Sequence, residues 1–212
     1  MKAKQLLLFS LLVLGPASGR ADERSAELLG RLRAKVRTMS SYRLDFTATV
    51  EDGGTMQGRL TVSGQRFAAQ VQGQELYCDG TTLWNYTPQQ HEVTVERLDP
   101  KSSSLFSNPS KLLDIDPADY THRSLPEVSD PKGKRLAVVE LTPKARMEDV
   151  STLTLYIDPA TSLPERIAIA SPAAAEPVEL TLQGIQSPVP VSESTFRFDV
   201  KAHPGVEVID FR

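Results

Sequence analysis

The chain has 212 residues, of which 40% are hydrophobic, and its 24 Lys plus Arg against 27 Asp plus Glu give a formal net charge of −3. This acidic balance argues against nucleic-acid binding, because phosphate backbones would be repelled. The apolar content is sufficient for one sizeable domain, and no Gly/Ser-rich linker or internal repeat divides the sequence.

The first residues have the pattern of a secretory signal peptide. Two lysines precede the apolar run Leu6–Leu14, and small residues follow it. An uncleaved membrane anchor is the alternative, but the run is much shorter than the roughly 20 residues that span a bilayer. We expect a signal peptide over residues 1–21, cleaved after Gly19 or Ala21, and one mature domain over residues 22–212. The only cysteine, Cys78, is far from the cleavage site, so we expect an exported protein without a lipid anchor.

An amphipathic helix is predicted over residues 22–39. Its apolar residues recur at steps of three and four, as required for one buried helix face, and charged residues occupy the other sides. The residues expected to face the core are Leu28, Leu29, Leu32, Val36 and Met39.

After the helix the apolar residues alternate with polar ones, which is typical of strands with one buried face. The first predicted strand runs from Tyr42 to Val50 and ends at a Gly-containing turn. The same alternation returns at Leu60 and Val62, Phe67 to Val71, Val93 and Val95, Leu136 and Val138, Leu153 to Ile157, Ile167 and Ile169, Val178 to Leu182, and Phe196 and Phe198. We expect about ten or eleven strands.

The stretch from Asp79 to Leu98 predicts a β-hairpin. It opens with an Asp-Gly turn dipeptide and contains a second turn at Pro88, with alternating residues between and after. Trp84 and Tyr86 are two residues apart, so they share one face of the strand.

A segment between the predicted strand that ends near Arg97 and the one predicted near Tyr120 interrupts the strand pattern. Asn108 followed by a proline is a typical helix start, and the segment is unusually apolar for a surface connection. Its large apolar residues are Leu105, Phe106, Leu112 and Leu113. The segment is expected either to pack as an ordinary loop against the core or to form a mobile cover.

These elements indicate a mainly β fold with helices (α+β). Antiparallel strands that are apolar on one face can pack as two sheets or close into a barrel, and composition does not choose between them. A wide or incompletely closed barrel would leave a cavity. One helix and one apolar segment fit a curved sheet whose concave side is covered.

Catalytic and metal-binding patterns are not evident. His91, His122 and His203 have no ligand partner at helical spacing, and the sequence contains no nucleophile elbow, dinucleotide fingerprint or P-loop. The acidic run Asp114–Asp119 looks like a calcium loop, but it contains Pro117 and lacks the turn glycine and terminal glutamate, so solvated or helix-capping carboxylates are favoured. We expect no enzyme activity, metal or cofactor.

Several segments in the same order resemble the outer-membrane lipoprotein carrier family, LolA. "DGTTLWNYTP" is similar to that family's hairpin, and "TMSSYRLDFTATVED", "QGRLTVSGQRFAAQV", "LTPKA", "LTLYIDPATSLPERIAI" and "FRFDVKAHPGVEVID" are similar to its other segments. The resemblance covers nearly the whole mature chain. It implies a periplasmic carrier built as an incomplete antiparallel β-barrel with a helical lid over an apolar cavity.

One position departs from the family pattern. An Arg-Pro pair usually precedes the Phe of the third strand, and that Arg helps to hold the lid closed. Here Gly64 is nearest to the expected Arg, the Pro is absent, and Arg66 lies close by, before the matching Phe67. Whether lid closure uses Arg66 or no Arg at all is left open by the sequence.

The resemblance implies that the chain shields acyl chains of a lipoprotein, or another lipid, on the way to the outer membrane. The candidate cavity residues are Leu44, Phe46, Leu60, Val62, Phe67, Ala69, Trp84 and Tyr86, each with plain core packing as its alternative, and Leu105, Phe106, Leu112 and Leu113 would form the lid. An inner-membrane ABC-type release complex and an outer-membrane receptor are implied partners of a monomeric carrier. The alternatives are an envelope sensor with the same fold and an exported hydrolase.

Overall fold

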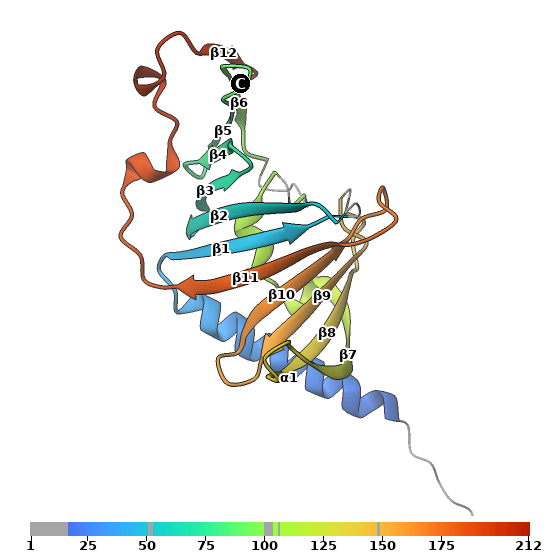
Figure 1. Ribbon diagram of the computed structural model, residues 1–212. Coiled ribbons are helices and arrows are strands. Elements are labelled where there is room, and N and C mark those ends of the chain that lie inside the picture. The colour runs from blue at the N-terminus through green and yellow to red at the C-terminus, as the bar shows by residue number, and fades with distance from the viewer. Residues whose placement is uncertain (1–16, 51–52, 100–103, 106, 148) are drawn as a thin grey trace, which may run out of the picture.

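The computed structural model describes residues 17–50, 53–99, 104–105, 107–147 and 149–212. Within these residues the chain forms one α-helix, twelve strands and four short 3-10 helices (Figure 1). The elements in chain order are α1 (Ala17–Arg37), β1 (Tyr42–Thr49), β2 (Thr55–Ser63), β3 (Arg66–Val71), β4 (Gln74–Cys78), β5 (Thr82–Thr87), β6 (Glu92–Arg97), η1 (Pro109–Leu112), η2 (Pro117–Asp119), β7 (Tyr120–Ser129), β8 (Arg135–Pro143), β9 (Thr152–Asp158), β10 (Leu163–Ala170), β11 (Val178–Gln186), η3 (Glu193–Phe196), η4 (Val200–Ala202) and β12 (Glu207–Asp210).

All twelve of these strands belong to one open sheet, which confirms the expected incomplete barrel. The order is β12-β6-β5-β4-β3-β2-β1-β11-β10-β9-β8-β7, so β1 joins two consecutive meanders by pairing with β2 on one side and β11 on the other. The pairs are antiparallel except for β12, which lies parallel to β6. The sheet twists and curves from β12 to β7 without closing (Figure 1).

One face of the sheet, called here the inner face, carries the main hydrophobic core. Strand β1 alternates buried and half-buried residues, with Leu44 and Phe46 among those on the inner face. This period of two is the one predicted from the sequence, and it places one side of each strand in the core. The opposite face is called the outer face.

Helix α1 packs across the inner face. Leu28, Leu29, Leu32 and Val36 are buried in the main core, which confirms the predicted apolar side. The helix contacts β7 and η2, and Arg33 donates to Asp116 with an Nη1–Oδ1 distance of 3.0 Å. Asp116 also accepts from the backbone N–H of Ala118, so the acidic run supplies a helix-capping carboxylate, as favoured from the sequence.

The connection between β6 and β7 lies against the same face. Leu105, Leu112 and Leu113 are all buried in the main core, together with residues of α1 and of the sheet. Figure 1 shows the short helices of this connection behind the central strands, on the side of the sheet that α1 covers. Phe106, the fourth residue of the predicted lid, lies outside the described residues.

The C-terminal segment, residues 187–206, connects β11 to β12 and packs on the outer face near β5. Figure 1 shows it running from β11 past the ends of the central strands to β12. The expected strand at Phe196 and Phe198 was wrong: Phe196 ends η3, and neither residue belongs to a strand. Both are buried because the segment packs on the sheet, which gives an alternating pattern without strand pairing.

Two of the described strands, β4 and β12, were not predicted from the sequence. The predicted hairpin of β5 and β6 was confirmed, with Trp84 opposite Val95.

The expected signal peptide extends over residues 1–21, of which 1–16 lie outside the described residues. Ala17–Ala21 form the start of α1. Among the helices that the structure describes, none has the length and apolar character needed to cross a membrane.

Candidate functional site: an apolar cavity on the inner face

A cavity of about 420 Å³ lies between the inner face of the sheet and the connection that precedes β7. Its size falls within the roughly 300–1,000 Å³ of typical ligand sites. Residues of β1 to β5, β10 and β11 form its floor and sides, and Leu105 with residues of η1 covers it. The apolar lining residues are Phe46, Ala48, Met56, Leu60, Ala69, Val71, Leu76, Leu105, Pro109, Leu112, Ile169, Val178 and Leu180.

Polar residues occur on only one side of this lining. Gln74 and Glu75 begin β4, and Asn85 lies on the neighbouring strand β5. The remaining walls are aliphatic, apart from Phe46 and the sulfur of Met56. Such a cavity can solvate a hydrocarbon chain, because transfer of apolar surface out of water is favourable and requires no specific polar partner.

Three of the eight predicted cavity residues line this cavity: Phe46, Leu60 and Ala69. They come from three adjacent strands and meet because the two-residue period points all of them to the inner face. Leu44 and Phe67 are fully buried in the main core, and Val62 lies in the same core, but none of these three lines the cavity. All three residues pack in the core, which is the alternative role that the sequence left open for them.

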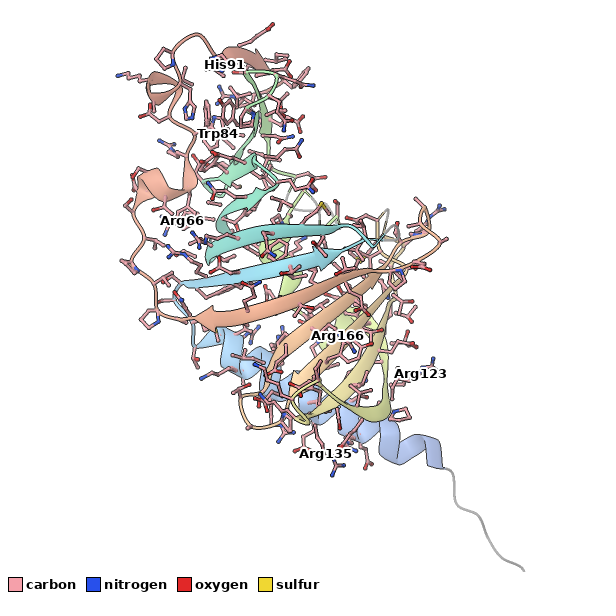
Figure 2. The ribbon with its side chains drawn as sticks, viewed as in Figure 1. Arg66, Trp84, His91, Arg123, Arg135 and Arg166 are labelled. Atoms are coloured by element: carbon pink, nitrogen blue, oxygen red, sulfur yellow. The ribbon has the colours of Figure 1, made fainter. Side chains whose placement is uncertain are left out.

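The placement of Trp84 and Tyr86 in the cavity was wrong. The two residues do share one face, but it is the outer one, where they belong to a separate cluster with Val93 and Phe198. The rings of Tyr86 and Phe198 lie 4.8 Å apart between centroids. Figure 2 shows Trp84 near the returning C-terminal segment, away from α1. The alternation of β5 instead directs Leu83 to the main core and Asn85 to the cavity.

Arg66 also points away from the cover. It precedes Phe67 on β3, and since Phe67 faces the core, Arg66 lies on the outer face. Its guanidinium carbon is 5.1 Å from the centre of the Phe196 ring, and it donates to Ser63 Oγ at 3.3 Å. Figure 2 shows Arg66 beside the C-terminal segment. Arg66 therefore fixes this segment and does not contact η1 or Leu105.

Several lining residues were missed from the sequence. Val178, Leu180 and Ile169 come from β10 and β11, more than 100 residues from the first strands, and they reach the cavity because β11 pairs with β1. Met56 and Val71 lie at strand ends, where the alternation is too short to identify the buried face. Strand periodicity does not show that β11 pairs with β1, and it is this pairing that brings residues of β10 and β11 to the cavity.

One serine and one histidine lie within hydrogen-bond distance but do not form an accessible catalytic pair. Ser25 Oγ and His122 Nδ1 are 2.8 Å apart. Ser25 lies on the buried side of α1 and is fully buried, so its hydroxyl is out of reach of a substrate and instead joins the helix to His122 of β7. Among the described residues, no group of three or more His, Cys, Asp and Glu side chains is arranged to hold a metal ion.

Comparisons with known proteins agree with this architecture. The family model described as outer membrane lipoprotein carrier protein LolA matches residues 37–199. No sequence among the curated proteins is significantly similar to this chain.

Solved structures that are similar to this chain have low sequence identity to it. An uncharacterized conserved protein from Thermus thermophilus has a TM-score of 0.59 at 13% identity, covering 88% of this chain and 99% of that chain. A putative outer membrane lipoprotein-sorting protein domain from Vibrio parahaemolyticus gives 0.49 at 14%, covering 83% and 97%. A LolA superfamily protein from Nitrosomonas europaea gives 0.44 at 14%, covering 83% and 98%.

Proposed function

Because this chain belongs to the outer membrane lipoprotein carrier family LolA, we propose that it shields the acyl chains of a lipoprotein, or of another lipid, during transfer through the periplasm to the outer membrane. The observation that carries the proposal is the apolar cavity of about 420 Å³ on the inner face of the sheet. In this role Phe46, Leu60 and Ala69 contact the acyl chain, and Leu105 and Leu112 form its cover.

The physical need for such a carrier follows from the cost of exposing hydrocarbon to water. Burial is worth roughly 0.8 kcal/mol per methylene, so an acyl chain of about fifteen methylenes costs on the order of 12 kcal/mol to expose. A cavity with aliphatic walls solvates the chain nearly as well as a bilayer does. The free energy of transferring the chain between bilayer and cavity is then small, so a membrane release complex can drive loading and a receptor can drive release.

Neighbouring residues on β3 provide a matched pair of variants for the test. Ala69 lines the cavity, whereas Ala68 lies beside it in sequence and therefore on the outer face, opposite Tyr77. Ala69→Phe fills part of the cavity and Ala68→Phe leaves it unchanged. Displacing two methylenes of a bound chain corresponds to about a tenfold loss of affinity.

The experiment measures binding of a synthetic palmitoylated lipopeptide by native mass spectrometry and by displacement of a hydrophobic dye. We expect saturable binding to the unmodified protein, about tenfold weaker binding to Ala69→Phe, and unchanged binding to Ala68→Phe. Absence of binding to the unmodified protein, or equal loss in both variants, would contradict the proposal. The mass of the exported protein tests the expected cleavage after Gly19 or Ala21.

A further inference from the structure

A second pocket of about 330 Å³ lies on the other side of η1 from the apolar cavity. Leu105, Pro109 and Leu112 line the first cavity, whereas Asn108, Ser110 and Lys111 line the second. Leu60 and Val62 are two residues apart on β2 and line one space each. Two residues on a strand span about 7 Å, so the two spaces lie next to each other along the inner face.

The second pocket differs from the first in its chemistry. Polar groups from three parts of the chain line it: Gln65 from the turn before β3, Asn108 and Ser110 from the connection, and Tyr42 from the start of β1. Asn108 and Ser110 are themselves buried, and Ser110 Oγ donates to Asn108 Oδ1 at 2.5 Å. The pocket therefore places polar groups beside the apolar residues Val36, Met39, Val62 and Leu98, where the neighbouring cavity is almost wholly apolar.

The hydroxyl of Tyr42 is the group in this pocket that needs a partner. Tyr42 is only 4% exposed, and its hydroxyl oxygen is buried without a hydrogen-bond partner among the described residues. Burial, together with the nearby negative charge of Asp114, raises the pKa of Tyr42, so the phenol remains a proton donor at neutral pH. Buried hydroxyls are almost always hydrogen-bonded, which indicates that an acceptor from outside the chain belongs here.

Charges around the pocket restrict what this acceptor can be. Arg37 and Lys111 line the pocket together with Asp114, so both signs are present. A neutral group with an acceptor oxygen suits this mixture. The carbonyl of an acyl ester or amide is such a group, and it is joined directly to the hydrocarbon chain.

We propose that the second pocket binds the ester or amide carbonyl that joins an acyl chain to its head group, with the Tyr42 hydroxyl as the donor. The chain would then lie in the apolar cavity and its polar linkage beneath η1, along Leu60 and Val62. This inference rests on the proposed carrier function, because it requires an acyl chain in the first cavity. It places the head-group end of the lipid at the second pocket and the end of the acyl chain in the apolar cavity. It also gives the buried Tyr42 hydroxyl a hydrogen-bond acceptor.

The test compares monopalmitoyl glycerol with its ether analogue, hexadecyl glycerol, which has the same chain length and lacks the carbonyl. Their affinities are measured by dye displacement for the unmodified protein and for Tyr42→Phe, which keeps the ring and removes only the hydroxyl. Tyr156→Phe, on β9 with its ring under Arg166, is the matched control. One neutral hydrogen bond corresponds to about a 2- to 10-fold change in affinity.

We expect Tyr42→Phe to weaken binding of the ester about 2- to 10-fold more than binding of the ether, and Tyr156→Phe to change neither. Equal affinities of the unmodified protein and Tyr42→Phe for the ester would overturn the inference while leaving the carrier function intact. If the unmodified protein binds neither probe, the carrier function itself is contradicted, and the inference fails with it. Thermal unfolding of each variant verifies that the fold is retained.

Discussion

The ring of Phe46 lies directly against the α-carbon of Gly58, its partner on the adjacent strand. A Cβ atom added at Gly58 would be 2.2 Å from Phe46 Cζ, closer than non-bonded atoms can approach. Phe46 also lines the apolar cavity. The absence of a side chain at Gly58 therefore allows the outer end of the Phe46 ring to lie against β2.

Replacing Gly58 with alanine should reduce the cavity. The new methyl group forces the Phe46 ring away from β2, and the space on its other side is the cavity. We expect Gly58→Ala to lower the free energy of unfolding by about 1–3 kcal/mol, as overpacking usually does, and to weaken binding of a palmitoyl lipid. Urea unfolding and dye displacement measure the two effects.

Gly30 provides the control for this variant. It lies on α1, and an added Cβ would meet no atom within 4 Å. Gly30→Ala should leave lipid affinity unchanged and stabilise the helix by about 0.5–1 kcal/mol. Full lipid affinity in a folded Gly58→Ala protein would mean that the position of the Phe46 ring does not limit the cavity.

Adjacent leucines in the cover should have separable effects. Leu112 lines the cavity, whereas Leu113 is fully buried in the core and does not line it. Replacing either with alanine should cost about 2–5 kcal/mol of stability. Only Leu112→Ala should weaken binding of a palmitoyl lipid, by about 3- to 10-fold, because it removes apolar surface from the cavity wall. Equal affinity losses in both variants would indicate a general loosening of the fold.

The single tryptophan should be insensitive to bound lipid. Trp84 packs on the outer face with Tyr86 and Phe198, on the opposite side of the sheet from the cavity. A palmitoyl chain brominated at mid-chain quenches tryptophan fluorescence on contact. We expect it to bind with unchanged Trp84 emission. Strong quenching at saturation would show that the acyl chain lies on the outer face.

The hydrogen-bonded ion pair between Asp79 and Arg197 should weaken in acid. Burial alone would raise the pKa of Asp79, but hydrogen bonds from Thr82, Arg197 and Thr81 outweigh it and hold the pKa below its usual value. A folded-state pKa below the unfolded value, about 3.9, means that the contribution to stability is complete above the unfolded pKa. It is lost as the pH falls through the folded-state pKa.

The variant Asp79→Asn measures this contribution. We expect a loss of about 1–3 kcal/mol in the free energy of unfolding at pH 7, with the difference from the unmodified protein shrinking below about pH 3.9. Asp45→Asn removes an ion pair with Arg59 at the surface and should cost only about 0–1 kcal/mol. A difference that persists unchanged at pH 2 would rule out the carboxylate charge as its source.

Local patterns were sufficient to predict the first elements of this fold. The alternation from Tyr42 onward identified β1 and its buried face, and the spacing of Leu28 to Val36 identified the buried side of α1. The Asp-Gly turn was also correct, since Asp79 Oδ1 accepts from the backbone N–H groups of Thr81 and Thr82. These features are determined by residues that are close to one another in the chain, so they can be predicted from the sequence.

The side of the sheet on which a strand's apolar residues lie could not be predicted in the same way. Trp84 and Tyr86 have the alternation of a core-facing pair, but the outer face near β5 is also apolar because the C-terminal segment covers it with Phe198. Both faces of β5 are therefore partly buried, and periodicity alone does not distinguish them. The same segment explains why Phe196 and Phe198 resembled a strand.

The location of a bound acyl chain is the most direct test of the carrier proposal. A palmitoyl lipid with a photoreactive diazirine at mid-chain, crosslinked to the protein and mapped by peptide mass spectrometry, reports which residues touch the chain. We expect crosslinks at the cavity lining, on peptides that contain Phe46, Leu60 or Leu112. Crosslinks confined to the outer cluster around Trp84, or none under saturating lipid, would contradict the account.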